Sequence, residues 1–134
     1  MALANGCFDL LHVGHVRLIA EARELAEVLV VALNSDASVR AQKGAGRPCV
    51  PLEERMELLA ALEGVDYVTS FPEPSAEPML RVLRPELQVK GTDWTEESVP
   101  EGATVRAYGG RVVICGDPKR HSSRALFRRI RRRE

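Results

Sequence analysis

Apolar residues follow two different patterns along this chain, one typical of buried strands and one typical of helices. Residues 28–33 form an unbroken apolar run, as expected of a strand that is covered on both faces. Across residues 15–26, apolar positions recur every three or four residues among charged ones, which predicts an amphipathic helix. A shorter apolar run at 2–5 ends at the turn pair Asn5-Gly6. The first third of the chain therefore reads as strand, helix, strand.

The same alternation continues to the last residues. Further strands are predicted at 65–70, 87–90 and 112–115, and further helices at 34–41, 51–63, 75–83 and 122–133. The segment between the last two strands is predicted to be a loop. Strands that alternate with helices and have continuous hydrophobicity predict an α/β fold with a doubly wound parallel sheet. Right-handed crossovers would then place a ligand cleft at the carboxyl ends of the strands.

Length and composition indicate how many domains to expect and in which compartment the protein would be found. The 134 residues fit a single domain, 1–134, and 45% hydrophobic with 28% charged residues is ordinary for a soluble protein. The three cysteines are far apart and form no C-x-x-C pair, so neither a disulfide framework nor a zinc site is expected. No signal peptide is expected, and no apolar stretch approaches the about 20 residues of a membrane span. Reduced thiols favour a cytoplasmic protein.

Charge is balanced overall, at 19 basic and 19 acidic residues, but it is unevenly distributed. Residues 119–134 hold eight of the basic residues and one acidic residue, so the predicted last helix, 122–134, is strongly basic. A tail of this kind is able to bind nucleic acid or phosphate. A solvated helix end is the favoured interpretation, and a nucleic-acid partner is not expected.

Candidate chemistry lies where the first predicted strand passes into the first helix. His12 and His15 lie there on either side of Gly14, in an H-x-G-H pattern. A helix amino terminus attracts phosphate through its unpaired N–H groups, and two imidazoles would add donors for charge that develops on phosphate oxygens. Asp9 is a candidate to orient an imidazole or help hold a metal ion. Capping or packing is the structural alternative for the two histidines.

The run Gly6-Cys7-Phe8-Asp9-Leu10-Leu11-His12-Val13-Gly14-His15 resembles the signature of the cytidylyltransferase-like nucleotidyltransferases, which share a Rossmann-like fold. Several later segments resemble the adenylyltransferase domain of bifunctional heptose-phosphate enzymes, which makes ADP-heptose from heptose 1-phosphate and ATP. These segments are 34–40, 43–48, 54–55, 65–68, 89–94 and 107–110. The chain has no room for a kinase half, so the resemblance implies a free-standing adenylyltransferase.

The resemblance also implies roles for individual residues. His12 and His15 would contact the triphosphate and stabilise the transition state, and Lys43, in a glycine-rich loop, would bind the leaving phosphates. The residues expected to bind the nucleotide lie in three segments and are Gly6, Phe8, Asp9, Gly14, Lys90, Gly91, Asp93, Trp94, Ser122, Ser123 and Arg124. No metal ligand from the protein is implied, and Mg²⁺ is expected to arrive bound to the nucleoside triphosphate.

The last of these segments departs from the family. Relatives commonly carry Ser-Thr-Thr followed by a basic residue, whereas here Arg124 takes the place of the third hydroxyl and Ala125 follows. Serine at a helix start is also a common cap. Arg55 is left between two interpretations, a phosphate ligand or a partner of glutamates on its own helix.

Together these observations predict an enzyme that condenses ATP with a sugar phosphate and releases pyrophosphate. One alternative is a cytidylyltransferase that uses CTP and glycerol 3-phosphate or another alcohol phosphate. Another is an adenylyltransferase for a different acceptor, such as flavin mononucleotide. A nucleotide-binding module without turnover is a third. A homodimer is expected from the family alone.

Overall fold

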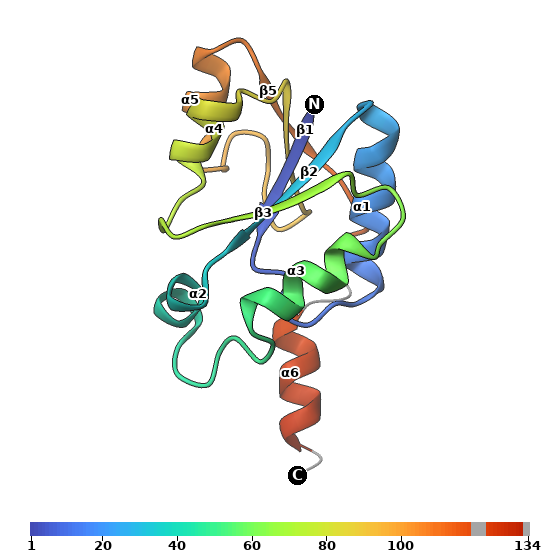
Figure 1. Ribbon diagram of the computed structural model, residues 1–134, viewed down its shortest axis with the longest axis vertical. Helices are drawn as coiled ribbons and strands as arrows, with labels where there is room; N and C mark the ends of the chain where they lie inside the picture. Colours follow the sequence, from blue (N-terminus) through green and yellow to red (C-terminus); the bar gives the residue numbers. More distant parts are fainter. Residues whose placement is uncertain (119–122, 133–134) are drawn as a thin grey trace.

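The computed structural model describes residues 1–118 and 123–132, and within them the chain forms one sheet flanked by helices (Figure 1). The sheet has five strands, β1 Ala2–Gly6, β2 Leu29–Asn34, β3 Tyr67–Phe71, β4 Leu87–Lys90 and β5 Arg111–Ile114. Their order is β3-β2-β1-β4-β5, and every neighbouring pair is parallel. The predicted doubly wound parallel sheet is confirmed.

Two helix pairs cover the two faces of the sheet. Helices α1 (Val13–Leu25) and α3 (Leu52–Ala60) pack through Ile19, Ala22 and Leu59 onto one apolar cluster of strand residues. Helices α4 (Glu77–Leu83) and α5 (Gly102–Ala107) pack through Leu80 and Val105 onto the other. Strand β2 is buried at all six positions, because helices lie on both of its faces.

The remaining helices lie toward the carboxyl edge of the sheet. Helix α2 (Asp36–Lys43) follows β2 directly, and α6 (Ser123–Arg132) projects from the body beneath α3 (Figure 1). The predicted last helix, 122–133, is thus present over the part of it that the structure describes.

The segment between β4 and β5 differs from the prediction of a loop, because it contains α5. This helix spans only six residues and begins at a glycine, so it lacks the length over which helical periodicity is recognisable. Burial of Val105 among β-strand and α4 residues stabilises it. Other element boundaries differ from the predicted ones by a few residues, as frayed helix ends do.

Strand β1 sits at the point where the chain's crossovers diverge. The connection from β1 leads to β2 on one side, while the chain later returns from β3 to β4 on the other side of β1. In an open parallel sheet this arrangement separates the loops that follow the two central strands and leaves a crevice between them.

Candidate active site

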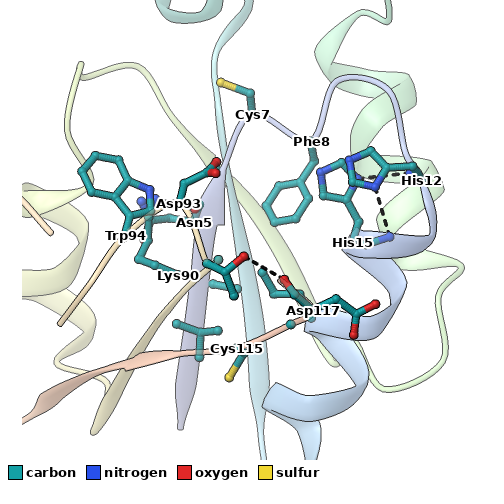
Figure 2. Close-up of a pocket in the computed structure, with 18 of the residues that line it drawn as sticks. Asn5, Cys7, Phe8, His12, His15, Lys90, Asp93, Trp94, Cys115 and Asp117 are labelled. Atoms are coloured by element: carbon teal, nitrogen blue, oxygen red, sulfur yellow. Dashed lines mark hydrogen bonds between the residues drawn. The ribbon is translucent and has the colours of Figure 1, made fainter. Parts of the chain in front are cut away.

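A cleft of about 440 Å³ opens at this crevice. Its walls are the turn after β1, the first residues of α1, the end of α2, and the segments that follow β4 and β5. Most of the predicted site residues line it: Gly6, Phe8, His12, Gly14, His15, Lys43, Lys90, Gly91, Asp93 and Trp94. Figure 2 shows the two histidines on one side of this cleft and Lys90 with Trp94 on the other.

The two histidines hold the first turn of α1 in place and face the cleft at the same time. His12 is the N-cap residue, and its Nδ1 accepts a hydrogen bond from the N–H of Gly14 at 3.0 Å. The Nδ1 of His15 accepts in return from the N–H of His12 at 3.2 Å. This reciprocal pairing is a capping box built from two imidazoles, so the structural alternative, capping, is present as well.

That pairing also fixes the tautomer of both rings. Because each Nδ1 accepts a backbone hydrogen bond, the neutral ring carries its proton on Nε2. The rings are stacked with centroids 3.9 Å apart and an angle of 27° between their planes. Two imidazoles therefore lie together at a helix amino terminus, the arrangement expected of a phosphate site.

The His15 ring is held in its neutral form. Burial lowers the pKa of His15 to about 3, and the charges of His12 and Lys43 push it in the same direction. At neutral pH the ring therefore donates from Nε2 without carrying a charge of its own. Lys43 lines the same cleft as His15.

Phe8 closes the turn between β1 and the histidines. Its backbone is left-handed, with φ 48°, and its ring lies 5.2 Å from the His15 ring, centroid to centroid. A Cβ at Gly6 would stand 3.3 Å from the Phe8 ring, so glycine leaves the space that the ring occupies. Few non-glycine residues adopt this conformation.

Lys43 ends helix α2 and reaches the cleft from the side opposite β4. The chain leaves the helix at Gly44, whose φ of 97° is a conformation that favours glycine. Asp36 in the first turn and Lys43 in the last turn both suit the helix dipole.

Lys90 lies at the end of β4, beside the cleft, and its ammonium already has a partner inside the protein. Its Nζ donates to the carbonyl of Asn5 at 3.1 Å and lies 5.4 Å from the centroid of the Trp94 ring. Burial lowers the pKa of Lys90, although Glu101, Cys7 and Asp93 oppose that shift. Trp94 is half-buried, and the carboxylate of Asp93 is exposed to the cleft.

Asp9 does not line the cleft, contrary to the prediction from the sequence. The residue is 1% exposed and is not among those that line the cleft. It accepts hydrogen bonds from Arg47 at 2.7 Å and from the backbone N–H groups of Cys49 and Val50 at 2.9 Å. Burial alone would raise the pKa of Asp9, but these hydrogen bonds and the charge of Arg47 lower it. The expectation that Asp9 contacts nucleotide, an imidazole or a metal is therefore corrected: its donors fill its acceptor sites.

Arg55 is likewise neither a phosphate ligand nor a partner of surface glutamates. The residue is fully buried and donates to the carbonyls of Val50, Cys7 and Asn34 at 2.8–3.0 Å and to the carboxylate of Asp36 at 2.6 Å. It ties α3 to the ends of β1 and β2. Its charge therefore serves to hold these three elements together.

Several lining residues were not predicted, and most of them come from strand ends: Asn5, Cys7, Asn34, Gln42, Thr92 and residues 115–118. Residues 115–118 follow β5, and the hydroxyl of Thr92 donates to the carbonyl of Asp117 at 2.7 Å. The rule that sites lie at the carboxyl ends of parallel strands would have found both Asn34 and this segment.

The third predicted segment lies largely outside the described residues. Ser122 is not described, and Ser123 and Arg124 are described only as the backbone that begins α6. Their predicted contacts with nucleotide stay predictions. Across residues 1–118 and 123–132, no group of three or more His, Cys, Asp or Glu side chains is arranged to hold a metal ion.

Comparisons with known proteins identify the family of this chain. The model of the family described as cytidylyltransferase-like matches residues 3–129. "Bifunctional protein HldE" of Syntrophotalea carbinolica is 45% identical over 130 residues, which is 97% of this chain and 26% of that protein. The protein of the same name from Hahella chejuensis is 44% identical over 132 residues, 98% of this chain and 28% of that protein. The chain thus spans about a quarter of the length of these relatives.

Solved structures show the same fold. A lipopolysaccharide core biosynthesis protein from Thermoplasma volcanium superposes with a TM-score of 0.75 at 22% identity, over 88% of this chain and 97% of that one. A protein of unknown function from Archaeoglobus fulgidus superposes with a TM-score of 0.65 at 21% identity, over 85% and 96%. In the part of the chain that the structure describes, no helix is long and apolar enough to cross a membrane.

Proposed function

The chain belongs to the cytidylyltransferase-like family of nucleotidyltransferases, and we propose that it condenses ATP with a sugar phosphate of the heptose 1-phosphate type. The products are an ADP-sugar and pyrophosphate. The observation that carries the proposal is the pair of stacked imidazoles, His12 and His15, that line the cleft at the amino terminus of α1. Preference for ATP and a heptose rests on the 45% identity to a protein named bifunctional HldE and on the resemblance to heptose-phosphate adenylyltransferase domains.

The proposed reaction is an in-line displacement at the α-phosphorus. An oxygen of the sugar phosphate attacks, the bond to the β-phosphate breaks, and pyrophosphate leaves with the electron pair. The attacking phosphate is already ionised at neutral pH, so the protein needs no strong base. Its contribution is to align the two phosphates and to neutralise developing charge.

Each wall of the cleft has a part in this reaction. His12 and His15 donate to oxygens of the α- and β-phosphates, and Lys43 neutralises the departing pyrophosphate. A neutral His15 suits this role, because it donates a hydrogen bond without releasing a proton during the reaction. Trp94 and Asp93, across the cleft, would bound the nucleoside, with Ser122, Ser123 and Arg124 on the phosphates.

Mg²⁺ would enter with the nucleotide. Triphosphate oxygens and water would hold it, because Mg²⁺ prefers hard oxygen ligands. Bound there, the ion would supply positive charge to the phosphates.

An acceptor screen tests this proposal. Purified protein with ATP and Mg²⁺ is given each of a panel of sugar 1-phosphates, glycerol 3-phosphate and flavin mononucleotide, and pyrophosphate release is measured. We expect pyrophosphate release with a heptose 1-phosphate to exceed that with glycerol 3-phosphate or flavin mononucleotide by at least tenfold. Tight ATP binding without pyrophosphate from any acceptor would instead indicate a nucleotide-binding module.

A cytidylyltransferase that acts on an alcohol phosphate is the second candidate, and the family model that matches the chain favours it. Such an enzyme would need the same histidine pair. Release of pyrophosphate from CTP with glycerol 3-phosphate, and little from ATP with sugar phosphates, would support it.

A further inference from the structure

Helix α6 touches the body of the protein through Phe127. The guanidinium carbon of Arg47 lies 4.9 Å from the centroid of the Phe127 ring, and that of Arg131 lies 5.6 Å from the same centroid. Phe127 is half-buried, whereas Ile130, one turn further on, is 48% exposed. The ring is therefore a contact between the body and a helix that projects from it (Figure 1).

Arg47 in turn connects two walls of the cleft. It comes four residues after Lys43, in the loop that follows α2, and its Nε donates to Asp9 at 2.7 Å. Asp9 follows Phe8 in the turn that leads to His12. The side chains of Arg47 and Asp9 are 5% and 0% exposed, so this ion pair is buried behind the cleft rather than in it.

The pair is poorly explained by stability alone. Removing two charges from water is costly, and a buried ion pair is often no better for stability than apolar side chains of the same volume. Here the Nη2 of Arg47 is also buried without a hydrogen-bond partner among the described residues, a further cost. What the pair does provide is a fixed spacing between two segments: residues 44–51, which follow Lys43 and are called the lysine loop, and residues 7–12, which lead into α1 and are called the histidine turn.

We propose that Phe127, Arg47 and Asp9 form a positioning chain that docks α6 against the lysine loop and the histidine turn, and that nucleotide binding depends on it. This inference rests on the proposed function, because α6 begins at Ser123 and Arg124, which the family resemblance puts on the phosphates. Neither Phe127 nor Arg47 lines the cleft, so both act through other residues.

Three variants of α6 separate this role from a general loss of packing. Phe127→Leu keeps an apolar side chain but removes the ring, Phe127→Tyr keeps the ring, and Ile130→Ala changes an exposed residue of the same helix. Affinity for a non-hydrolysable ATP analogue is measured by calorimetry. Since a guanidinium–ring contact is worth a modest factor, we expect binding to weaken about fivefold in Phe127→Leu and to change less than about twofold in the other two.

Trypsin gives a second readout that needs no nucleotide. Helix α6 contains several arginines, so a helix that undocks is cleaved faster between Arg124 and Arg132. Cleavage in Phe127→Leu is expected to be faster than in the wild type, and in Phe127→Tyr to match it. Equal cleavage and equal affinity in Phe127→Leu and Ile130→Ala would overturn the proposal.

A double-mutant cycle tests the link to Arg47. Arg47→Lys keeps a charge for Asp9 but loses the flat group that lies on the ring. If the positioning chain acts as one unit, the double variant Arg47→Lys/Phe127→Leu binds the ATP analogue no more weakly than the weaker-binding single variant. If the fold-losses in affinity of the two single variants multiply in the double variant, Arg47 and Phe127 act independently, which contradicts the proposal. If wild-type protein binds the analogue but releases no pyrophosphate with any acceptor, the proposed function fails while these comparisons still decide the positioning chain.

Discussion

At the start of α1, His12 and His15 each use Nδ1 to accept a backbone hydrogen bond, and both residues also line the cleft. Capping and phosphate binding are therefore not competing explanations of the H-x-G-H pattern. The hydrogen bonds that complete the helix also set the tautomer that a phosphate requires. Removing either ring would disturb both functions, so a test needs separate readouts for folding and for turnover.

The first prediction concerns His15. His15→Ala removes a charge-stabilising donor, and turnover is expected to fall a hundredfold or more, which corresponds to roughly 3 kcal/mol in the transition state. Pyrophosphate release measures turnover, and circular dichroism checks that the chain is folded. Glu24→Ala, an exposed change on the same helix, serves as the control and should leave turnover unchanged. A His15→Ala protein with near-normal turnover would remove the histidine pair from the mechanism.

The second prediction follows from the lowered pKa of His15. Because the folded-state pKa, about 3, lies below the ordinary value of 6.5, protonation favours the unfolded chain. The stabilisation is present above pH 6.5 and is lost as the pH falls toward 3. Between pH 7 and pH 5 this group alone is expected to cost roughly 2 kcal/mol of folding free energy.

Urea unfolding of wild type and His15→Gln at both pH values measures that contribution. The difference in stability between pH 7 and pH 5 should be smaller in the variant. Equal pH dependence in the two proteins would mean that His15 titrates normally in the folded state.

At the scale of elements, Arg55 holds the carboxyl ends of β1 and β2 against α3. It donates to the carbonyls of Cys7 and Asn34, and both of these residues line the cleft. The floor of the site is therefore fixed by a buried cation that never reaches the ligand.

The third prediction tests that role. Arg55→Met leaves the buried carbonyls of Cys7 and Asn34 without this donor, and the free energy of unfolding should drop by about 3 kcal/mol or more. Arg81→Met is the matched control: its side chain is 67% exposed and its pair with Glu77 is a surface i, i+4 contact, so it should cost under about 0.5 kcal/mol. Chemical denaturation measures both. A small loss in Arg55→Met would show that water or a rearranged side chain replaces the cation.

The fold was predictable because each strand and most helices have a recognisable pattern of apolar residues in their own sequence. The buried run at 28–33 and the spacing in 15–26 depend only on neighbouring residues. Helix α5 was missed because its stability comes from burial of Val105 against distant strands rather than from its six residues.

Long-range pairing limited the prediction of the site in the same way. The motif placed His12 at the site, whereas Lys43 and Trp94 were assigned to it through the family resemblance, and all three line one cleft. The partners of Asp9 lie 38 to 41 residues away, and two of them are backbone groups, so nothing near Asp9 in the sequence indicated that it is already satisfied. Residue type alone does not distinguish a charged group that binds a ligand from one that holds two loops together.

On the scale of the whole molecule, the sheet order puts the two halves of the site on opposite sides of β1. The histidine turn comes from β1 itself, the lysine loop follows β2, and the Trp94 segment follows β4. A cleft with walls from both sides can hold the donor and acceptor phosphates in line for transfer. The geometry is consistent with nucleotidyl transfer. The choice of ATP and of a heptose 1-phosphate is the part of the proposal that the geometry does not address.

One competition experiment addresses that choice directly. Equal concentrations of ATP and CTP are incubated with the protein, Mg²⁺ and a heptose 1-phosphate, and the nucleotide sugars are identified by mass spectrometry. The account predicts that ADP-heptose forms and exceeds CDP-heptose by at least tenfold. A predominance of CDP-heptose, or no nucleotide sugar at all, would contradict it.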